Sequence, residues 1–142
     1  IGIKLRPGQL VGVDEVKNRI KRNTDLILLK SGWSKMRGNK KYSTANPGVN
    51  PSVGYFLRSE YPRVRAIGFD WISLSSYLNR GIGREAHRAF LDPDGKGHPI
   101  VIIEDMDLSH ATPHLRQVLV FPLRIKGIDS APCTVVGRFS YD

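Results

Sequence analysis

Short apolar runs recur along the chain, and their length is typical of β-strands rather than helices. Residues 25–30 (DLILLK) are almost entirely apolar, which favours a strand covered on both faces. Residues 64–70 and 100–105 have the same character, and each run ends in acidic residues. Residues 1–5 alternate and predict a further strand. Near the end of the chain, residues 117–125 and 131–141 predict an antiparallel pair with Pro122 at an edge or a bulge.

Three other segments have helical spacing. Residues 14–20 place Val16 and Ile20 four positions apart, with Asp14 as a possible N-cap. A second helix is predicted to begin after Asn50, with Pro51 in its first turn, and to end before Pro62. Residues 84–91 form the third, and its apolar positions suit one face. Between these elements, residues 31–48 predict a long loop of the kind that often binds ligands, and residues 92–99 predict a turn-rich insertion.

The mixture of strands and helices predicts the α/β class, with α+β as the alternative. We expect a single layered domain over residues 1–142, with a mixed β-sheet and flanking helices, because 142 residues fit one domain.

Composition and charge narrow the cellular setting. No apolar run is long enough to span a membrane, and no signal peptide is recognisable. The chain has one cysteine, Cys133, so no internal disulfide can form and a cytoplasmic location is predicted. Its apolar surroundings predict a small buried residue rather than a nucleophile. The net charge of +9 raises the question of nucleic acid, but aromatic residues are not interleaved with the basic ones, so we expect solvated basic faces.

Candidate chemistry is concentrated in residues 83–110. His87 lies on the third predicted helix, and Glu104 ends an apolar strand. Imidazole and carboxylate both ligate metals, although the residues alone also allow a structural histidine and a solvated acid. The other histidines, His98, His110 and His114, lie in turn-like segments without the spacing of a helical zinc motif, and His98 is expected to be exposed.

Six segments occur in the order found in one enzyme family. They are DLILLKSGW, NPGVNPSVGYFL, VRAIGFDWISL, AHRAFL, IVIIEDMDL and VFPLRIKGIDSAPCTVVG. Together they resemble the cyclase-like metal-dependent hydrolases, which include bacterial kynurenine formamidase (arylformamidase) and isatin hydrolase. The resemblance covers nearly the whole chain and implies a swivelling β/β/α fold.

The resemblance also implies a chemistry. It predicts hydrolysis of a small-molecule amide, either a formamide as in tryptophan catabolism or a cyclic amide. Zinc or manganese would activate the water that attacks the acyl carbonyl. His87 and Glu104 match the family's ligand positions in AHRAFL and IVIIED. Trp33 is expected to contact the substrate, with a role as a core or loop anchor left open. Relatives imply a homo-oligomer.

The chain departs from the family at one important place. The HxGTHxDxPxH segment, which supplies the remaining ligands and the catalytic histidine, is absent from residues 1–142. The chain starts at Ile1 rather than Met, so we expect this N-terminal part to be missing from the sequence or supplied by a complementing segment. Smaller departures at Asp105, Met106, Ser130 and Thr134 affect the expected substrate more than the fold.

Two alternatives therefore stay open. The chain could be a catalytically inactive cyclase-like scaffold or binding subunit that lacks the metal motif. A basic nucleic-acid-binding domain has only the net charge in its favour.

Overall fold

The computed structural model of the protein describes residues 1–140. The chain divides into two compact units, Ile1–Ser109 and His110–Asp142. The predicted α/β class is confirmed: helices accompany parallel and antiparallel strands. The strands do not form the one mixed sheet that was expected, because the antiparallel pair closes locally as a separate two-stranded sheet. The predicted extent of a single domain, residues 1–142, stays a prediction.

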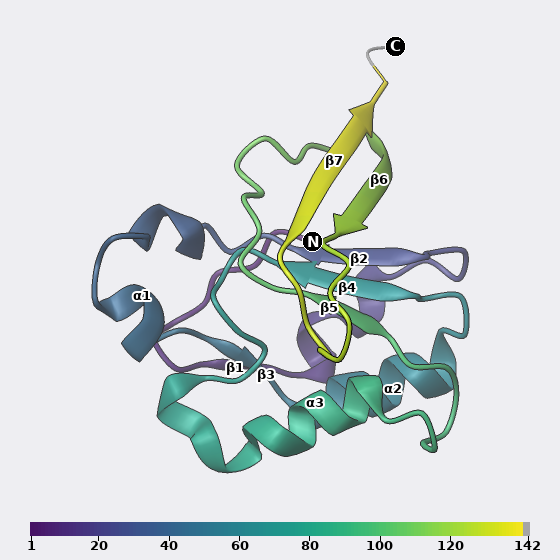
Figure 1. The fold of residues 1–142 in the computed structure, drawn as a ribbon, viewed down its shortest axis with the longest axis horizontal. Coiled ribbons are helices and arrows are strands. Elements are labelled where there is room, and N and C mark those ends of the chain that lie inside the picture. Colours follow the sequence, from purple (N-terminus) through teal and green to yellow (C-terminus); the bar gives the residue numbers. More distant parts are fainter. Residues whose placement is uncertain (141–142) are drawn as a thin grey trace. The chain divides into compact units, whose positions relative to one another are not determined.

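The first unit is built on a three-stranded parallel sheet in the order β2-β4-β5 (Figure 1). Its strands are β2 (Leu26–Leu29), β4 (Ala66–Phe69) and β5 (Val101–Ile103), all of which lie within the predicted apolar runs. Leu26 pairs with Ala66, and Ala66 pairs with Val101. Parallel strands need long crossovers, and here the intervening segments carry the helices. The three strands therefore end at one shared edge.

Two helices, α2 (Pro51–Glu60) and α3 (Gly83–Leu91), lie together on one side of this sheet (Figure 1). The N-cap prediction is confirmed, because Asn50 Oδ1 accepts a hydrogen bond of 3.0 Å from the Ser52 amide. The helices approach closely at Gly54, where a Cβ atom would lie 2.8 Å from the Ala89 backbone carbon. Their apolar faces and the sheet enclose the core. Its largest fully buried side chains include Trp71, Phe69, Phe90, Leu29, Leu57 and Ile67.

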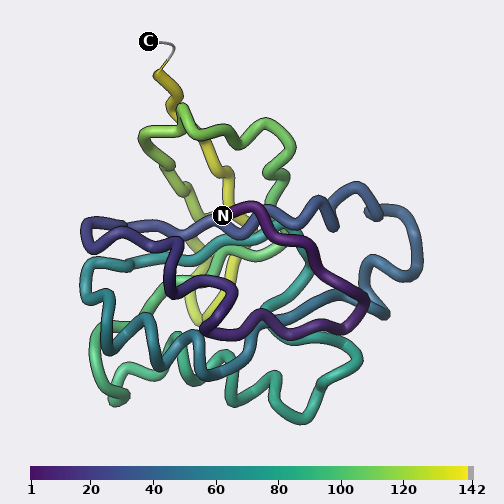
Figure 2. The backbone as a smooth tube through the Cα atoms, turned by 180° about the vertical axis from the view of Figure 1, so that it is seen from behind, coloured from purple at the N-terminus to yellow at the C-terminus, as the bar shows by residue number. Residues whose placement is uncertain are grey.

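Shorter elements complete the first unit, whose backbone Figure 2 shows from behind. The strands β1 (Leu10–Val11) and β3 (Gly48–Val49) pair in parallel. The short helices are η1 (Val13–Glu15), η2 (Lys17–Arg19), η3 (Trp33–Met36), α1 (Lys41–Thr44) and η4 (Tyr77–Ile82). The predicted long loop, residues 31–48, thus contains two short helices.

Two sequence predictions fail near the N-terminus. Residues 14–20 form two 3-10 turns rather than one helix, and Gly12 instead of Asp14 takes the N-cap position. Helices this short depend on tertiary contacts for their stability, and here Ile20 turns to an extended conformation. The expected strand at residues 1–5 is reduced to a parallel bridge between Gly2 and Lys30.

The second unit is an antiparallel hairpin of β6 (Leu115–Pro122) and β7 (Cys133–Phe139), as the sequence predicts (Figure 1). Pro122 is the last residue of β6, where its missing N–H does not interrupt the ladder. The end of the predicted strand at Tyr141 lies outside the described residues. The prediction of a buried Cys133 is wrong, because its side chain is exposed. A two-stranded sheet has too little depth to bury both of its faces.

The helices of residues 1–140 are all too short to cross a bilayer. The longest, α2, has 10 residues, whereas a transmembrane helix needs about 20.

Candidate functional site

Polar side chains follow all three strands of the parallel sheet at the edge where the strands end. Ser31 comes soon after β2, Asp70 directly after β4, and Glu104 directly after β5. Ligands of open α/β sheets commonly bind at this carboxyl edge. The sheet therefore gathers chemistry-bearing residues that are far apart in the sequence.

Asp70 fixes the turn that follows β2. Its buried carboxylate accepts hydrogen bonds from the Ser31 amide at 2.9 Å, the Ser31 hydroxyl at 2.6 Å and the Gly32 amide at 2.6 Å. Gly32 adopts a φ of 80°, a left-handed conformation that glycine enters without steric cost. Two of the segments that carry the family resemblance, SGW and GFDWIS, are thus joined directly by hydrogen bonds.

His87 lies in the second turn of α3 and is half-buried. Its Nδ1 lies 2.9 Å from the Gly83 carbonyl oxygen, which can only accept, so Nδ1 carries the proton when the ring is neutral. The Ser75 hydroxyl also lies near Nδ1, at 3.4 Å. The neutral ring therefore has its lone pair on Nε2. In metal sites, a backbone carbonyl that accepts from one ring nitrogen commonly orients the other nitrogen toward the metal.

Glu104 lies opposite that nitrogen. Its Oε1 atom is 3.7 Å from His87 Nε2, so the two residues selected from the sequence are adjacent in space. The Leu74 amide donates to Oε1 at 2.7 Å, and the Ser73 hydroxyl donates at 3.3 Å. The loop after β4 thereby orients the carboxylate toward the histidine.

The electrostatics of this pair favour a charged imidazole. The Glu104 carboxylate raises the pKa of His87 above its usual value, against the opposing effect of partial burial, and the Gly83 carbonyl adds to the increase. The same negative potential would favour a cation placed between the two residues.

Asp105, the next residue, has a φ of 55°, which is uncommon outside glycine but tolerated by Asp and Asn. Its carboxylate accepts from Arg37 Nη2 at 2.7 Å and from the Tyr42 hydroxyl. Its amide donates to the Trp71 carbonyl at 2.9 Å. The segment after β2 is therefore tied to the end of β5, next to Glu104. Burial raises the pKa of Tyr42 to about 12, and the hydrogen bond to Asp105 adds to the increase.

The remaining predicted residues lie elsewhere. Trp33 is buried, and its Nε1 donates to the Tyr42 carbonyl at 3.2 Å, which is the geometry of a core anchor. Its contact with a substrate stays a prediction. His98 is exposed, as predicted, and so are His110 and His114, which belong to the second unit.

Only two of the candidate ligands come together. Within residues 1–140 no three His, Cys, Asp or Glu side chains are grouped closely enough to hold a metal ion. The chemistry of His87 and Glu104 nevertheless suits a divalent metal. Two ligand atoms about 2.1 Å from one tetrahedral zinc lie roughly 3.4 Å apart, close to the separation seen here.

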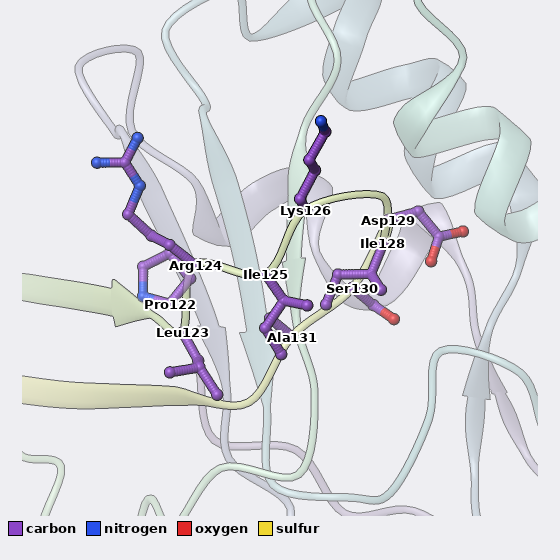
Figure 3. Close-up of a pocket in the computed structure, with 9 residues that line it drawn as sticks. All are labelled: Pro122, Leu123, Arg124, Ile125, Lys126, Ile128, Asp129, Ser130 and Ala131. Atoms are coloured by element: carbon purple, nitrogen blue, oxygen red, sulfur yellow. The ribbon is translucent and has the colours of Figure 1, made fainter.

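A cavity of about 540 Å³ lies within the second unit, lined by residues 122–126 and 128–131 at the end of β6 and in the connection to β7 (Figure 3). Leu123, Ile125 and Ile128 supply its apolar lining, and Arg124, Lys126 and Asp129 its charges. None of the lining residues is a predicted metal ligand, and Ser130 is the one among them at which the family resemblance implies an effect on the substrate.

Several supporting residues lie at positions that no sequence pattern marks. Ser73, Leu74 and Ser75 hold Glu104 and His87, and Arg37 with Tyr42 holds Asp105. Their contacts cross 12 to 68 positions of the chain, so no local pattern could reveal them. The acid of Asp70 at the strand end was visible in the sequence, but its partners after β2 were not.

No protein-family model matches the chain. No curated protein matches it either.

Proposed function

We propose that this chain is part of a metal-dependent amide hydrolase with a cyclase-like fold, and that His87 and Glu104 are two of its metal ligands. One observation carries the proposal: His87 Nε2 and Glu104 Oε1 lie 3.7 Å apart at the carboxyl edge of the parallel sheet. The Gly83 carbonyl also holds the ring in the tautomer that ligation by Nε2 requires.

Zinc or manganese bound there would act as a Lewis acid toward the acyl carbonyl of an aryl formamide or a cyclic amide and would activate the attacking water. The residues of this chain perform the supporting tasks. Leu74 and Ser73 orient the carboxylate of Glu104, and α3 fixes the imidazole of His87. The hydrogen bonds of Asp105 keep the backbone turned immediately after Glu104.

A catalytic zinc needs about three protein ligands and one open position. His87 and Glu104 supply two, so the proposal requires at least one ligand from outside residues 1–140. The need for a further ligand favours a second candidate function, a cyclase-like scaffold without catalytic activity. A measurement of metal binding distinguishes the scaffold from the hydrolase. A scaffold that has lost its metal function has no reason to bind a cation at His87.

Binding of Mn²⁺ followed by NMR is the most direct test, because a paramagnetic ion broadens the resonances nearest to it even when binding is weak. The ring signals of His87 should broaden at Mn²⁺ concentrations that leave His98 and His110 sharp. Glu104→Gln should abolish this selectivity, because the variant keeps the shape of the side chain and removes its charge. Equal broadening of all four histidines would contradict the proposal.

Activity is measured on the complete natural protein. With zinc or manganese added, it should release formate from an aryl formamide, and His87→Ala should abolish the release while His98→Ala does not. Metal binding at His87 without any amide hydrolysis would contradict the proposed activity and also exclude a scaffold that has lost its metal function.

A further inference from the structure

The two edges of the β6–β7 hairpin differ in how well they are protected against pairing. The ladder of β6 is interrupted by a register shift between Leu115 and Gln117, and β6 ends in Pro122, which has no N–H to donate. A bulge and a proline are both devices that prevent further strands from joining an edge. The β7 strand, Cys133–Phe139, contains neither and carries a single charge, Arg138.

The outer edge of β7 is also unpaired. Among residues 1–140, the backbone hydrogen bonds outside the β6–β7 ladder involve none of the residues from Cys133 to Phe139. Alternate backbone N–H and C=O groups of the strand therefore point away from β6 and are available to another strand.

Exposed apolar side chains flank this edge. Leu119 and Val136 face each other across the ladder and are 42% and 47% exposed. Phe121, two residues along β6 on the same face, is 57% exposed. A lone two-stranded hairpin is marginally stable, so a hairpin with this much exposed apolar surface gains from a larger sheet.

We propose that β7 pairs antiparallel with β7 of a second copy of the chain, around a two-fold axis at Val136, and that the two hairpins form one four-stranded sheet. Val136 is the central residue of Cys133–Phe139, so this register pairs all seven residues. It also places Leu119, Val136 and the same two residues of the second copy in one apolar row.

The sequence of β7 is complementary to itself in this register. Arg138 lies opposite Thr134 of the second copy, so the only charged side chain of the strand does not meet its equivalent. Gly137 lies opposite Val135, and Cys133 lies opposite Phe139. Because β7 carries one charge, its charge pattern does not select an acidic strand of another protein. Two identical β7 strands can pair in this register without charge repulsion. The resulting contact uses the same surface on both copies, as two-fold interfaces do.

Disulfide trapping tests the register. In a Cys133→Ser background, Val136→Cys places two thiols opposite each other at the axis, and mild oxidation should give covalent dimers. Thr134→Cys in the same background is the matched control. Its two thiols would be four residues out of register, roughly 13 Å apart along the strands, beyond the reach of a disulfide. Equal cross-linking of both variants, or of neither, would overturn the proposal.

Charge substitution tests the pairing without a covalent bond. The wild-type chain should sediment as a reversible dimer, and Val136→Lys and Val136→Glu should each weaken the dimer at least about tenfold. An equimolar mixture of the two variants should restore it, which a folding defect could not do. A wild-type chain that remains a monomer at the highest concentration reached, or that pairs only with a different protein, would overturn the proposal. The result is independent of metal binding and of any hydrolase activity.

Discussion

The carboxylate of Asp70 holds Ser31 by two hydrogen bonds, one to its amide at 2.9 Å and one to its hydroxyl at 2.6 Å. The contact joins the ends of β2 and β4 at the edge that carries the candidate site. Asp70→Asn would place an amide NH₂ group against these donors. We expect the substitution to lower the free energy of unfolding by about 3 kcal/mol, because a buried charge-assisted network would be left partly unsatisfied.

Urea denaturation measures this loss. Asp25→Asn is the control, since Asp25 forms an exposed ion pair with Arg63 at 3.1 Å and such pairs contribute at most about 1 kcal/mol. Similar losses in the two variants would show that Asp70 is not an organising contact.

Arg58 provides a second prediction. Its side chain is buried, and Nη2 donates to the Asp92 carbonyl at 2.7 Å and to the Gly97 carbonyl at 3.0 Å. Arg58→Met should lower the free energy of unfolding by about 3 kcal/mol, because these carbonyls lose their donors. Arg63→Met, at an exposed position, should cost less than about 1 kcal/mol. Hydrogen exchange should accelerate in residues 92–99 of the Arg58 variant alone.

Gly54 tests the packing of α2 on α3. Alanine normally stabilises a helix relative to glycine by about 1 kcal/mol. At position 54 the added Cβ would lie 2.8 Å from the Ala89 carbonyl carbon, so Gly54→Ala should instead destabilise the protein by about 1–3 kcal/mol. Gly81→Ala is the control, because nothing lies within 4 Å of the added atom. A stabilising Gly54→Ala would mean that the helices are farther apart than described.

The raised pKa of Tyr42 predicts that the stability of the folded protein falls at high pH. Its pKa is raised from the usual value to about 12, so the neutral phenol is favoured in the folded protein. The stabilisation is complete below the unfolded value, about 10, and is lost as the pH rises to about 12.

An absorbance titration of phenolate formation should resolve one of the five tyrosines near pH 12. Tyr42→Phe should remove that step and flatten the decline of stability between the two pH values. A titration near pH 12 that Tyr42→Phe leaves unchanged would contradict the described contact with Asp105.

The sequence predicts the elements whose signals are local. Residues 26–29 and 66–69 are short apolar runs, and α2 has its cap at Asn50 and its proline at position 51. Predictions fail where tertiary contacts decide. Residues 14–20 have helical spacing, yet the chain closes two separate 3-10 turns there. Cys133 lies in an apolar run but on a sheet with too little depth to cover it.

The candidate site likewise combines residues that the sequence indicates with residues that only the structure reveals. His87 and Glu104 could be selected from residue type and position, and the structure places them within 3.7 Å of each other. The loop that orients them, with Leu74 and Ser75, has no sequence signature, because its role depends on where β4 ends relative to β5 and α3. Every residue type except proline has a backbone N–H, so the Leu74 contact could be found only in three dimensions.

The way Arg58 holds residues 92–99 has a practical consequence for protein engineering. The Arg58 guanidinium binds main-chain oxygens of Asp92 and Gly97. The contact therefore depends on the backbone conformation of residues 92–99 rather than on the side chains of that segment. Gly95 and Gly97 are the exceptions, since a Cβ at Gly95 would lie 3.0 Å from the guanidinium and one at Gly97 would meet the Arg58 main-chain oxygen. Exposed Lys96 can therefore be exchanged for a residue that carries a fluorophore without disturbing the anchor. The segment offers a labelling position at which a probe would report local opening of the first unit.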